Sequence, residues 1–183
     1  MQHHNHKLIL ASQSPRRRQL LEEGGFQFSV LAPTDEVEQG VASGLTPRDF
    51  VIESAYLKAQ FAAAQTESGI ILAADTVAHC ESQVLGKPES PDDALRMLRM
   101  MRGKQHQVLT GVCLWHRPSD LHKKYMESTT LRMDHVSDEQ LMKYLESGGC
   151  NELRVSILVP VLQDVRVKRQ LIFKAIVLLS TKP

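Results

Sequence analysis

Serine, proline and arginine residues at the start of an expected helix are the most informative chemical feature of this chain of 183 residues. The run Leu8–Leu21 is typical of a short apolar strand, a turn with two serines, and a helix that opens with three arginines. Ser14 is a suitable N-cap, Pro15 fits the first helical position, and the Gly24-Gly25 pair supplies a stop.

The charge at this helix start is opposite to the usual one. The N-terminal end of a helix carries partial positive charge and normally attracts Asp or Glu, yet Arg16 and Arg17 occupy it here. The run Ser90–Asp93 has the same Ser-Pro opening and continues with two aspartates. Free N–H groups, hydroxyls and a pair of guanidinium groups suit a phosphate. The first helix therefore predicts an anion site, and a solvated basic helix start is the alternative.

Asp75 is the second candidate, because it follows the apolar run Gly69–Ala74. Ligands of open α/β sheets bind beyond the carboxyl ends of the strands. If strands 7–11 and 70–74 are parallel, Asp75 and the turn Ser12–Arg17 lie on the same rim of the sheet. A carboxylate there can orient a water molecule, accept its proton or hold a divalent cation. The alternative is that Asp75 only forms a turn.

Further charged residues could serve the same ligand. Asp35 and Glu36 lie in a turn after the second expected strand. Carboxylates there either bind Mg²⁺ together with phosphate oxygens and water or are simply solvated. Lys58 lies at the border of the apolar face of its helix, where it either reaches a phosphate or snorkels to solvent. Lys87 stands in a rigid Gly-Lys-Pro turn that could hold an ammonium group near the ligand.

These segments resemble the motifs of the Maf family of nucleoside triphosphate pyrophosphatases. The opening run resembles the family pattern L-A-S-x-S-P-R-R-x-x-L-L. Downstream segments resemble the family's acidic turn, its Lys-Ala helix, its catalytic segment, its second lysine and the strand that follows. In this chain they are Pro33–Glu36, Tyr56–Ala59, Ala73–Val77, Leu85–Pro88 and Gly103–Val112. Because the motifs occur in family order between residue 7 and the region of residue 149, the match is specific.

The resemblance implies a cytoplasmic enzyme that hydrolyses a nucleoside triphosphate to the monophosphate and pyrophosphate. It implies Asp75 as the catalytic proton acceptor, and Glu36 with Asp75 as ligands of Mg²⁺ or Mn²⁺. The residues implied to bind the substrate are Ser12, Arg16, Arg17, Lys58, Thr76 and Lys87. The Ala-Asp-Thr sequence resembles the subgroup that acts on dTTP and UTP, so a pyrimidine triphosphate or a modified relative is the expected substrate. The family also suggests a homodimer.

The elements that must position these residues alternate between strands and helices, which predicts a mixed α/β sheet flanked by helices. The resemblance adds the twisted sheet and central cleft of a Maf/Ham1-like fold. Expected strands cover residues 7–11, 26–32, 70–74, 107–116 and 126–134, and expected helices cover 15–23, 47–65, 91–102 and 138–147. The later strands resemble antiparallel hairpins. In the third helix, Ala94, Met97, Leu98 and Met101 share one apolar face. His106 is expected to be structural rather than catalytic.

Residues 150–183 depart from the family pattern. They lack its Gly-x-Tyr/Phe motif with the following glutamine and its Asn-Val-Val-Gly-Leu-Pro segment, and their charge is net basic. Gln163 stands near the expected place, but its surroundings do not match, so no role is assigned to it. We interpret residues 1–183 as a single Maf-like domain with a divergent C-terminal segment. One hypothesis is a frameshift, which translation of the coding DNA in the other two frames would test.

Composition excludes several other classes of protein. The formal net charge of +1 gives no electrostatic attraction to nucleic acid or membranes, and no apolar run has the length of a membrane span. Cys80, Cys113 and Cys150 have no C-x-x-C spacing, which favours reduced thiols over a disulfide framework or a zinc site. Two alternatives remain open: a catalytically impaired nucleotide-binding or division-regulatory protein of this family, and a marginally folded product.

Overall fold

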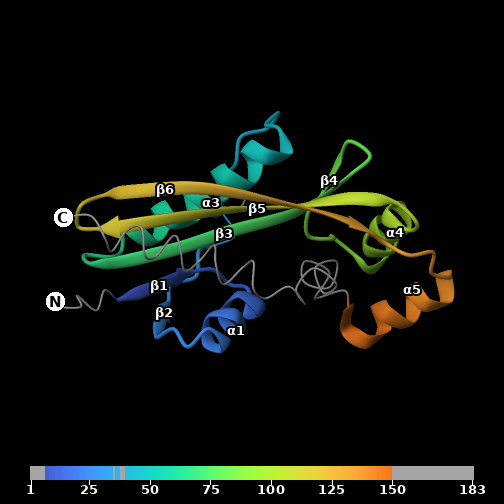
Figure 1. Ribbon diagram of the computed structural model, residues 1–183, viewed down its shortest axis with the longest axis horizontal. Coiled ribbons are helices and arrows are strands. Elements are labelled where there is room, and N and C mark those ends of the chain that lie inside the picture. The colour runs from blue at the N-terminus through green and yellow to red at the C-terminus, as the bar shows by residue number, and fades with distance from the viewer. Residues whose placement is uncertain (1–6, 35, 38–39, 150–183) are drawn as a thin grey trace. The chain divides into compact units, whose positions relative to one another are not determined.

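A computed structural model describes residues 7–34, 36–37 and 40–149 (Figure 1). The elements that precede the long sheet strands are β1 (Leu8–Ala11), α1 (Pro15–Glu23), β2 (Phe28–Val30) and α3 (Pro47–Ala63). They are followed by β3 (Gly69–Cys80), β4 (Gln83–Leu85), α4 (Pro91–Met101), β5 (Gln105–Arg117), β6 (Leu121–Arg132), α5 (Asp138–Tyr144) and the π-helical turn Leu145–Gly149. No helix among the described residues is long and apolar enough to cross a membrane.

The six strands form one mixed sheet in the order β2-β1-β3-β5-β6, with β4 paired to β3. β1 is parallel to both neighbours, so that Leu8 lies opposite Phe28 and Ile70. β4 runs antiparallel to β3, and the arrows of β5 and β6 point in opposite directions in Figure 1. The predicted α/β class, mixed sheet and antiparallel later strands are therefore confirmed.

The described residues divide into two compact units. The first contains the described residues up to Asp75 together with Gly111–Met126, and the second contains Thr76–Thr110 and the described residues from Glu127 onward. The strands β3, β5 and β6 each contribute residues to both units. The single domain over residues 1–183 and its central cleft stay predictions, and the interpretation of residues 150–183 lies outside the described residues.

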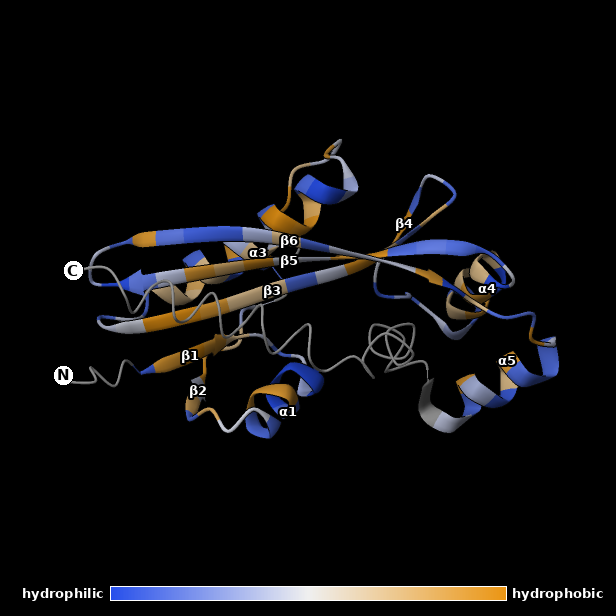
Figure 2. Cartoon of the chain, viewed as in Figure 1, coloured by the Kyte–Doolittle hydropathy of each residue, from blue (hydrophilic) through white to orange (hydrophobic). Residues whose placement is uncertain are grey.

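The first unit has an apolar layer on each face of its strands. All four residues of β1 are buried, as is typical of a strand covered by helices on both sides, and β1 is strongly apolar in Figure 2. Alternate residues of β1 point to opposite faces. Leu8 and Leu10 cluster with Leu21 of α1. On the other face, Ile9 and Ala11 cluster with the alanines of α3.

The second unit is built around α4. The four residues predicted to share one face of this helix are all buried, and they cluster with Ala78, Cys80, Leu85 and Leu141. Asp138, at the start of α5, accepts hydrogen bonds of 2.7 Å from Arg99 Nη2 and 2.6 Å from Arg102 Nη1. Both bonds lower the pKa of the Asp138 carboxyl group, and the bond from Arg99 has the larger effect. Apolar packing and this ion cluster therefore join α4 to α5.

Strand ends were the least accurate part of the prediction. The strand expected to end at Ala74 continues to Cys80, because Thr76 and Val77 favour a strand and residues 78–80 pair with β4. The last strand begins at Leu121 rather than Met126. Its first four residues are exposed and mostly polar, so they lack the apolar alternation that marks a strand. The three-residue strand β4 was missed.

Gly111 allows α3 to lie close to β5 in the first unit. A Cβ atom added there would collide with the backbone carbonyl group of Val51, which belongs to the buried part of α3. Backbone cannot yield as a flexible side chain can. The packing of α3 on the sheet therefore depends on the absence of a side chain at this position.

We expect Gly111→Ala to lower the free energy of unfolding by about 1–3 kcal/mol, because α3 must move outward to admit the methyl group. Urea denaturation measures this change. Gly86→Ala is the matched control, since a Cβ atom there meets nothing within 4 Å, and its effect should stay within about 0.5 kcal/mol. Equal stability of the two variants would contradict the close approach of α3.

Candidate active site

The N-terminus of α1 differs from the other helix starts. α3, α4 and α5 are capped by the side chains of Thr46, Ser90 and Ser137, and each has an acidic residue in its first turn. Ser14 is the N-cap of α1 as predicted, but its side chain caps no N–H group of the described residues, and the first turn of α1 has no acidic residue. The unusual charge at this helix start is therefore not neutralised by a local carboxylate in that turn.

Ser12 organises the turn that leads into α1. Its hydroxyl oxygen accepts a hydrogen bond of 3.1 Å from Arg17 Nη1 and one of 3.2 Å from the backbone N–H of Ser14. The Ser12 residue is only 4% exposed. Since both acceptor positions of the oxygen are used, the hydroxyl proton is available to donate to an anion. The structure thus joins two of the predicted substrate-binding residues, Ser12 and Arg17.

Arg16 and Arg18 are directed differently from Arg17. Arg16 forms an ion pair of 3.6 Å with Glu23 at the end of α1 and keeps a partly exposed side chain, and Arg18 is exposed. Among the three arginines, Arg17 is the one held against the Ser12 turn. The role of Arg16 in phosphate binding stays a prediction.

Lys58 and Asp75 form a buried ion pair between α3 and β3. The Nζ atom of Lys58 donates to Oδ1 of Asp75 at 2.7 Å, and the two side chains are 2% and 4% exposed. Lys58 lies among the small residues Ala55, Ala59 and Ala62 on the buried face of α3. A snorkelling lysine is therefore ruled out, and Asp75 lies inside β3 rather than in a turn after it.

The Ser12 turn follows the last residue of β1, and Asp75 lies on the neighbouring strand β3. Ala11 of β1 is opposite Ala73 of β3 in parallel register, and adjacent strands are about 4.8 Å apart. β1 ends at Ala11, whereas β3 continues past Asp75. The first unit thus places the Ser12 turn beside the strand that carries Asp75, and a shared site of their hydroxyl, guanidinium and carboxylate groups stays a prediction.

Thr76 makes a contact that the sequence did not predict. Its hydroxyl oxygen lies 3.1 Å from the hydroxyl oxygen of Thr110 on β5. Both residues are partly exposed and belong to the second unit. Thr110 was not among the predicted site residues, although a threonine beside Gly111 in an otherwise apolar stretch is a signal that could have found it.

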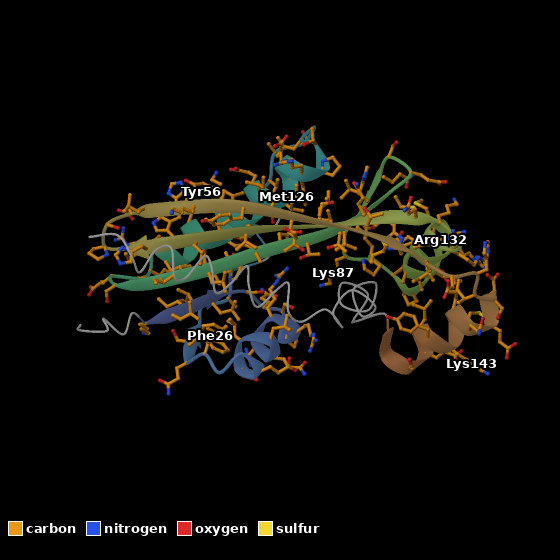
Figure 3. All side chains as sticks on the ribbon, in the orientation of Figure 1. Phe26, Tyr56, Lys87, Met126, Arg132 and Lys143 are labelled. Carbon is orange, nitrogen blue, oxygen red and sulfur yellow. The ribbon has the colours of Figure 1, made fainter. Side chains whose placement is uncertain are left out.

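Lys87 and Glu36 are both exposed. Their roles in binding the substrate and a metal ion stay predictions. Lys87 follows β4 in the second unit and is labelled in Figure 3. Glu36 lies in the described pair 36–37, and Asp35 lies outside the described residues. No cluster of three or more His, Cys, Asp or Glu side chains that could hold a metal occurs in the described part of the chain.

The described cysteines are poor nucleophiles. Burial raises the pKa of the Cys113 thiol to about 12 and also raises that of Cys80. Both are free and buried, and a thiol must lose its proton to attack. These two thiols are therefore poor candidates for nucleophilic catalysis.

Comparison with known proteins relates the sequence of this chain to one family. The family model described as Maf-like protein matches residues 7–153. A "dTTP/UTP pyrophosphatase" of Rhodopirellula baltica is 45% identical over 140 residues, which are 76% of this chain and 62% of the relative. The chain thus spans less than two thirds of that protein. A "dTTP/UTP pyrophosphatase" of Carboxydothermus hydrogenoformans is 38% identical over 141 residues, 77% of this chain and 74% of the relative.

Among solved structures, a HAM1 protein from Coxiella burnetii is similar with a TM-score of 0.45 and 17% identity, over 68% of this chain and 71% of that one. The family assignment rests on the sequence matches, which include the strand–turn–helix with Ser12 and Arg17 as well as the helix and strand that carry Lys58 and Asp75. The chain belongs to the family of Maf-like proteins.

Proposed function

We propose that this chain is a nucleoside triphosphate pyrophosphatase that converts dTTP, UTP or modified pyrimidine triphosphates to the monophosphate and pyrophosphate. The observation that carries the proposal is the buried Lys58–Asp75 pair, whose carboxylate lies on the strand next to the one that leads into the Ser12 turn. The names of the Rhodopirellula and Carboxydothermus relatives, both "dTTP/UTP pyrophosphatase", support the same reaction.

The Ser12 turn and the start of α1 bind the phosphate groups in this proposal. The hydroxyl group of Ser12 donates to a phosphate oxygen, and Arg17 supplies a charge-assisted hydrogen bond. The partial positive charge of the helix start favours the same anion. Because these donors are in place before the ligand arrives, they can stabilise negative charge that develops in the transition state.

Asp75 accepts the proton of the water molecule that attacks the α-phosphorus. A catalytic base must hold a fixed orientation, and the hydrogen bond from Lys58 to Oδ1 fixes the carboxylate. Lys58 also neutralises a charge that would otherwise be buried alone. An ammonium group has three donors, so the bond to Asp75 is compatible with a phosphate contact as well.

The carboxylates of the proposed site also suit a divalent cation. Mg²⁺ and Mn²⁺ prefer oxygen ligands and combine one or two carboxylates with phosphate oxygens and water. Oδ1 of Asp75 accepts from Lys58, so Oδ2 is the oxygen that would meet a cation, with Glu36 as the second proposed ligand. When bound, the cation would neutralise part of the charge of the triphosphate.

Thr76 and Thr110 are proposed to select the base. Their hydroxyl groups contact each other, and hydroxyls that can donate and accept suit the carbonyl and N–H edge of a pyrimidine. The buried free thiols Cys80 and Cys113 agree with the proposed cytoplasmic location. A homodimer remains part of the proposal from family resemblance alone.

Pyrophosphate release from a panel of nucleoside triphosphates, measured with Mg²⁺ and with Mn²⁺, tests the proposed reaction. We expect dTTP and UTP to be hydrolysed faster than purine triphosphates. We expect Asp75→Asn to lower kcat by about 10²- to 10⁴-fold, the usual contribution of a general base, with nearly unchanged nucleotide affinity by calorimetry. Nucleotide binding by the unaltered chain without pyrophosphate release would contradict the proposal.

The Lys58–Asp75 pair gives a prediction about stability. Lys58→Met leaves the carboxylate buried without its cation, so we expect a loss of about 3–5 kcal/mol in the free energy of unfolding by urea denaturation. The double variant Lys58→Met with Asp75→Leu should recover much of this loss, because both charges of the pair are removed together. The control Lys87→Met removes an exposed lysine and should change stability by less than about 0.5 kcal/mol. Equal effects of Lys58→Met and Lys87→Met would show that no buried pair forms.

Arg17 and Arg18 give a matched pair of variants on one helix. Arg17→Ala removes the guanidinium group that contacts Ser12, so we expect KM for dTTP to rise about 10- to 100-fold, the range for one charge-assisted hydrogen bond. Arg18→Ala removes the same charge from an exposed position and should leave KM nearly unchanged. Initial rates over a range of dTTP concentrations measure both. If the two variants raise KM equally, only the general charge of α1 matters.

A further inference from the structure

The second unit contains a pocket of about 300 Å³ that the proposed reaction does not use. It lies among residues of α4, β5, β6 and α5, and its walls are mostly apolar. Leu98, Met101 and Leu141 are buried wall residues. Arg132, at the end of β6 and labelled in Figure 3, is an exposed lining residue.

His106 is a polar side chain in this apolar wall. It is 6% exposed, and neither ring nitrogen has a hydrogen-bond partner among the residues that the structure describes. Burial lowers the pKa of its imidazole group, and the backbone of Lys104 opposes this shift in part. The ring is therefore neutral at neutral pH and offers one donor and one acceptor. Buried polar groups are nearly always paired, so this ring requires an explanation.

We propose that the pocket binds a small aromatic molecule with one hydroxyl group, a ligand of the phenol class. A hydroxyl group can donate or accept, so it can pair with either nitrogen of His106. The walls suit an aromatic ring, because Met101 and Met133 supply sulfur atoms and Leu98 and Leu141 supply aliphatic surface. A cavity of about 150 Å³ lined by apolar side chains already holds benzene, so this pocket has room for a substituted ring.

This site is independent of the proposed pyrophosphatase activity. All residues that line the pocket belong to the second unit, whereas Ser12, Arg17, Lys58 and Asp75 belong to the first. None of the proposed substrate or metal ligands lines the pocket. Loss of one function therefore leaves the other to be measured separately.

The test compares phenol with toluene, which has nearly the same size but no hydroxyl group, as ligands of the full chain. Competition between the two in saturation-transfer NMR gives their relative affinity. We expect phenol to bind about tenfold more tightly, the factor for one net hydrogen bond. His106→Leu should abolish this preference and keep toluene binding. His79→Leu, a histidine of the same unit outside the pocket lining, should change neither.

The ring ¹⁵N resonances of His106 in the unaltered protein provide a second measurement that needs no variant. We expect them to shift when phenol is added and to shift much less with toluene. Three results would each overturn the proposal. Phenol does not bind at millimolar concentration, the His106→Leu variant keeps the full preference for phenol, or the His106 resonances do not shift when phenol saturates the protein.

Discussion

The buried pair of Lys58 and Asp75 is the interaction on which the candidate site depends. Two charges removed from water carry a large desolvation cost, which close contact between them offsets only when the geometry is good. Here the distance is 2.7 Å and both side chains are almost fully covered. The pair therefore demands that α3 and β3 keep a fixed separation, and an error in that separation would leave a charge without its partner.

Small residues set this separation. Ala55, Ala59 and Ala62 of α3 are fully buried in the same cluster as Ala11 and Ala73 of the sheet. Their short side chains let α3 approach the sheet, and Gly111 on β5 has no side chain that would collide with the backbone of α3. The alanine-rich helix is thus more than a good helix former, because it brings the Lys58 ammonium group within reach of a carboxylate on the neighbouring strand.

Local sequence signals predicted the helices of this protein better than the partners of its charged side chains. Caps and prolines gave the first residues of α1, α3, α4 and α5 correctly, since these signals act within a few residues. The parallel pairing of β1 and β3 entered the sequence argument only as a condition, which the structure meets. The Lys58–Asp75 and Thr76–Thr110 contacts could not be predicted in the same way. They join residues 17 and 34 positions apart and depend on how α3 and β5 pack, which no local pattern specifies.

Each of the two proposed sites contains one feature that ordinary folding rules disfavour. These two features differ in charge, so the two sites suit different ligands. Sequences that fold well satisfy local rules nearly everywhere, so the exceptions are expected at functional positions. At α1 the exception is positive charge at a helix start without an acidic residue in its first turn, which an anion corrects. At His106 the exception is a neutral ring in a mostly apolar pocket wall, which a phosphate would correct poorly, because its charge would lose hydration against apolar side chains. An uncharged ligand with one polar group satisfies the second site and gains little at the first. The physical chemistry of this one chain therefore favours two different classes of ligand.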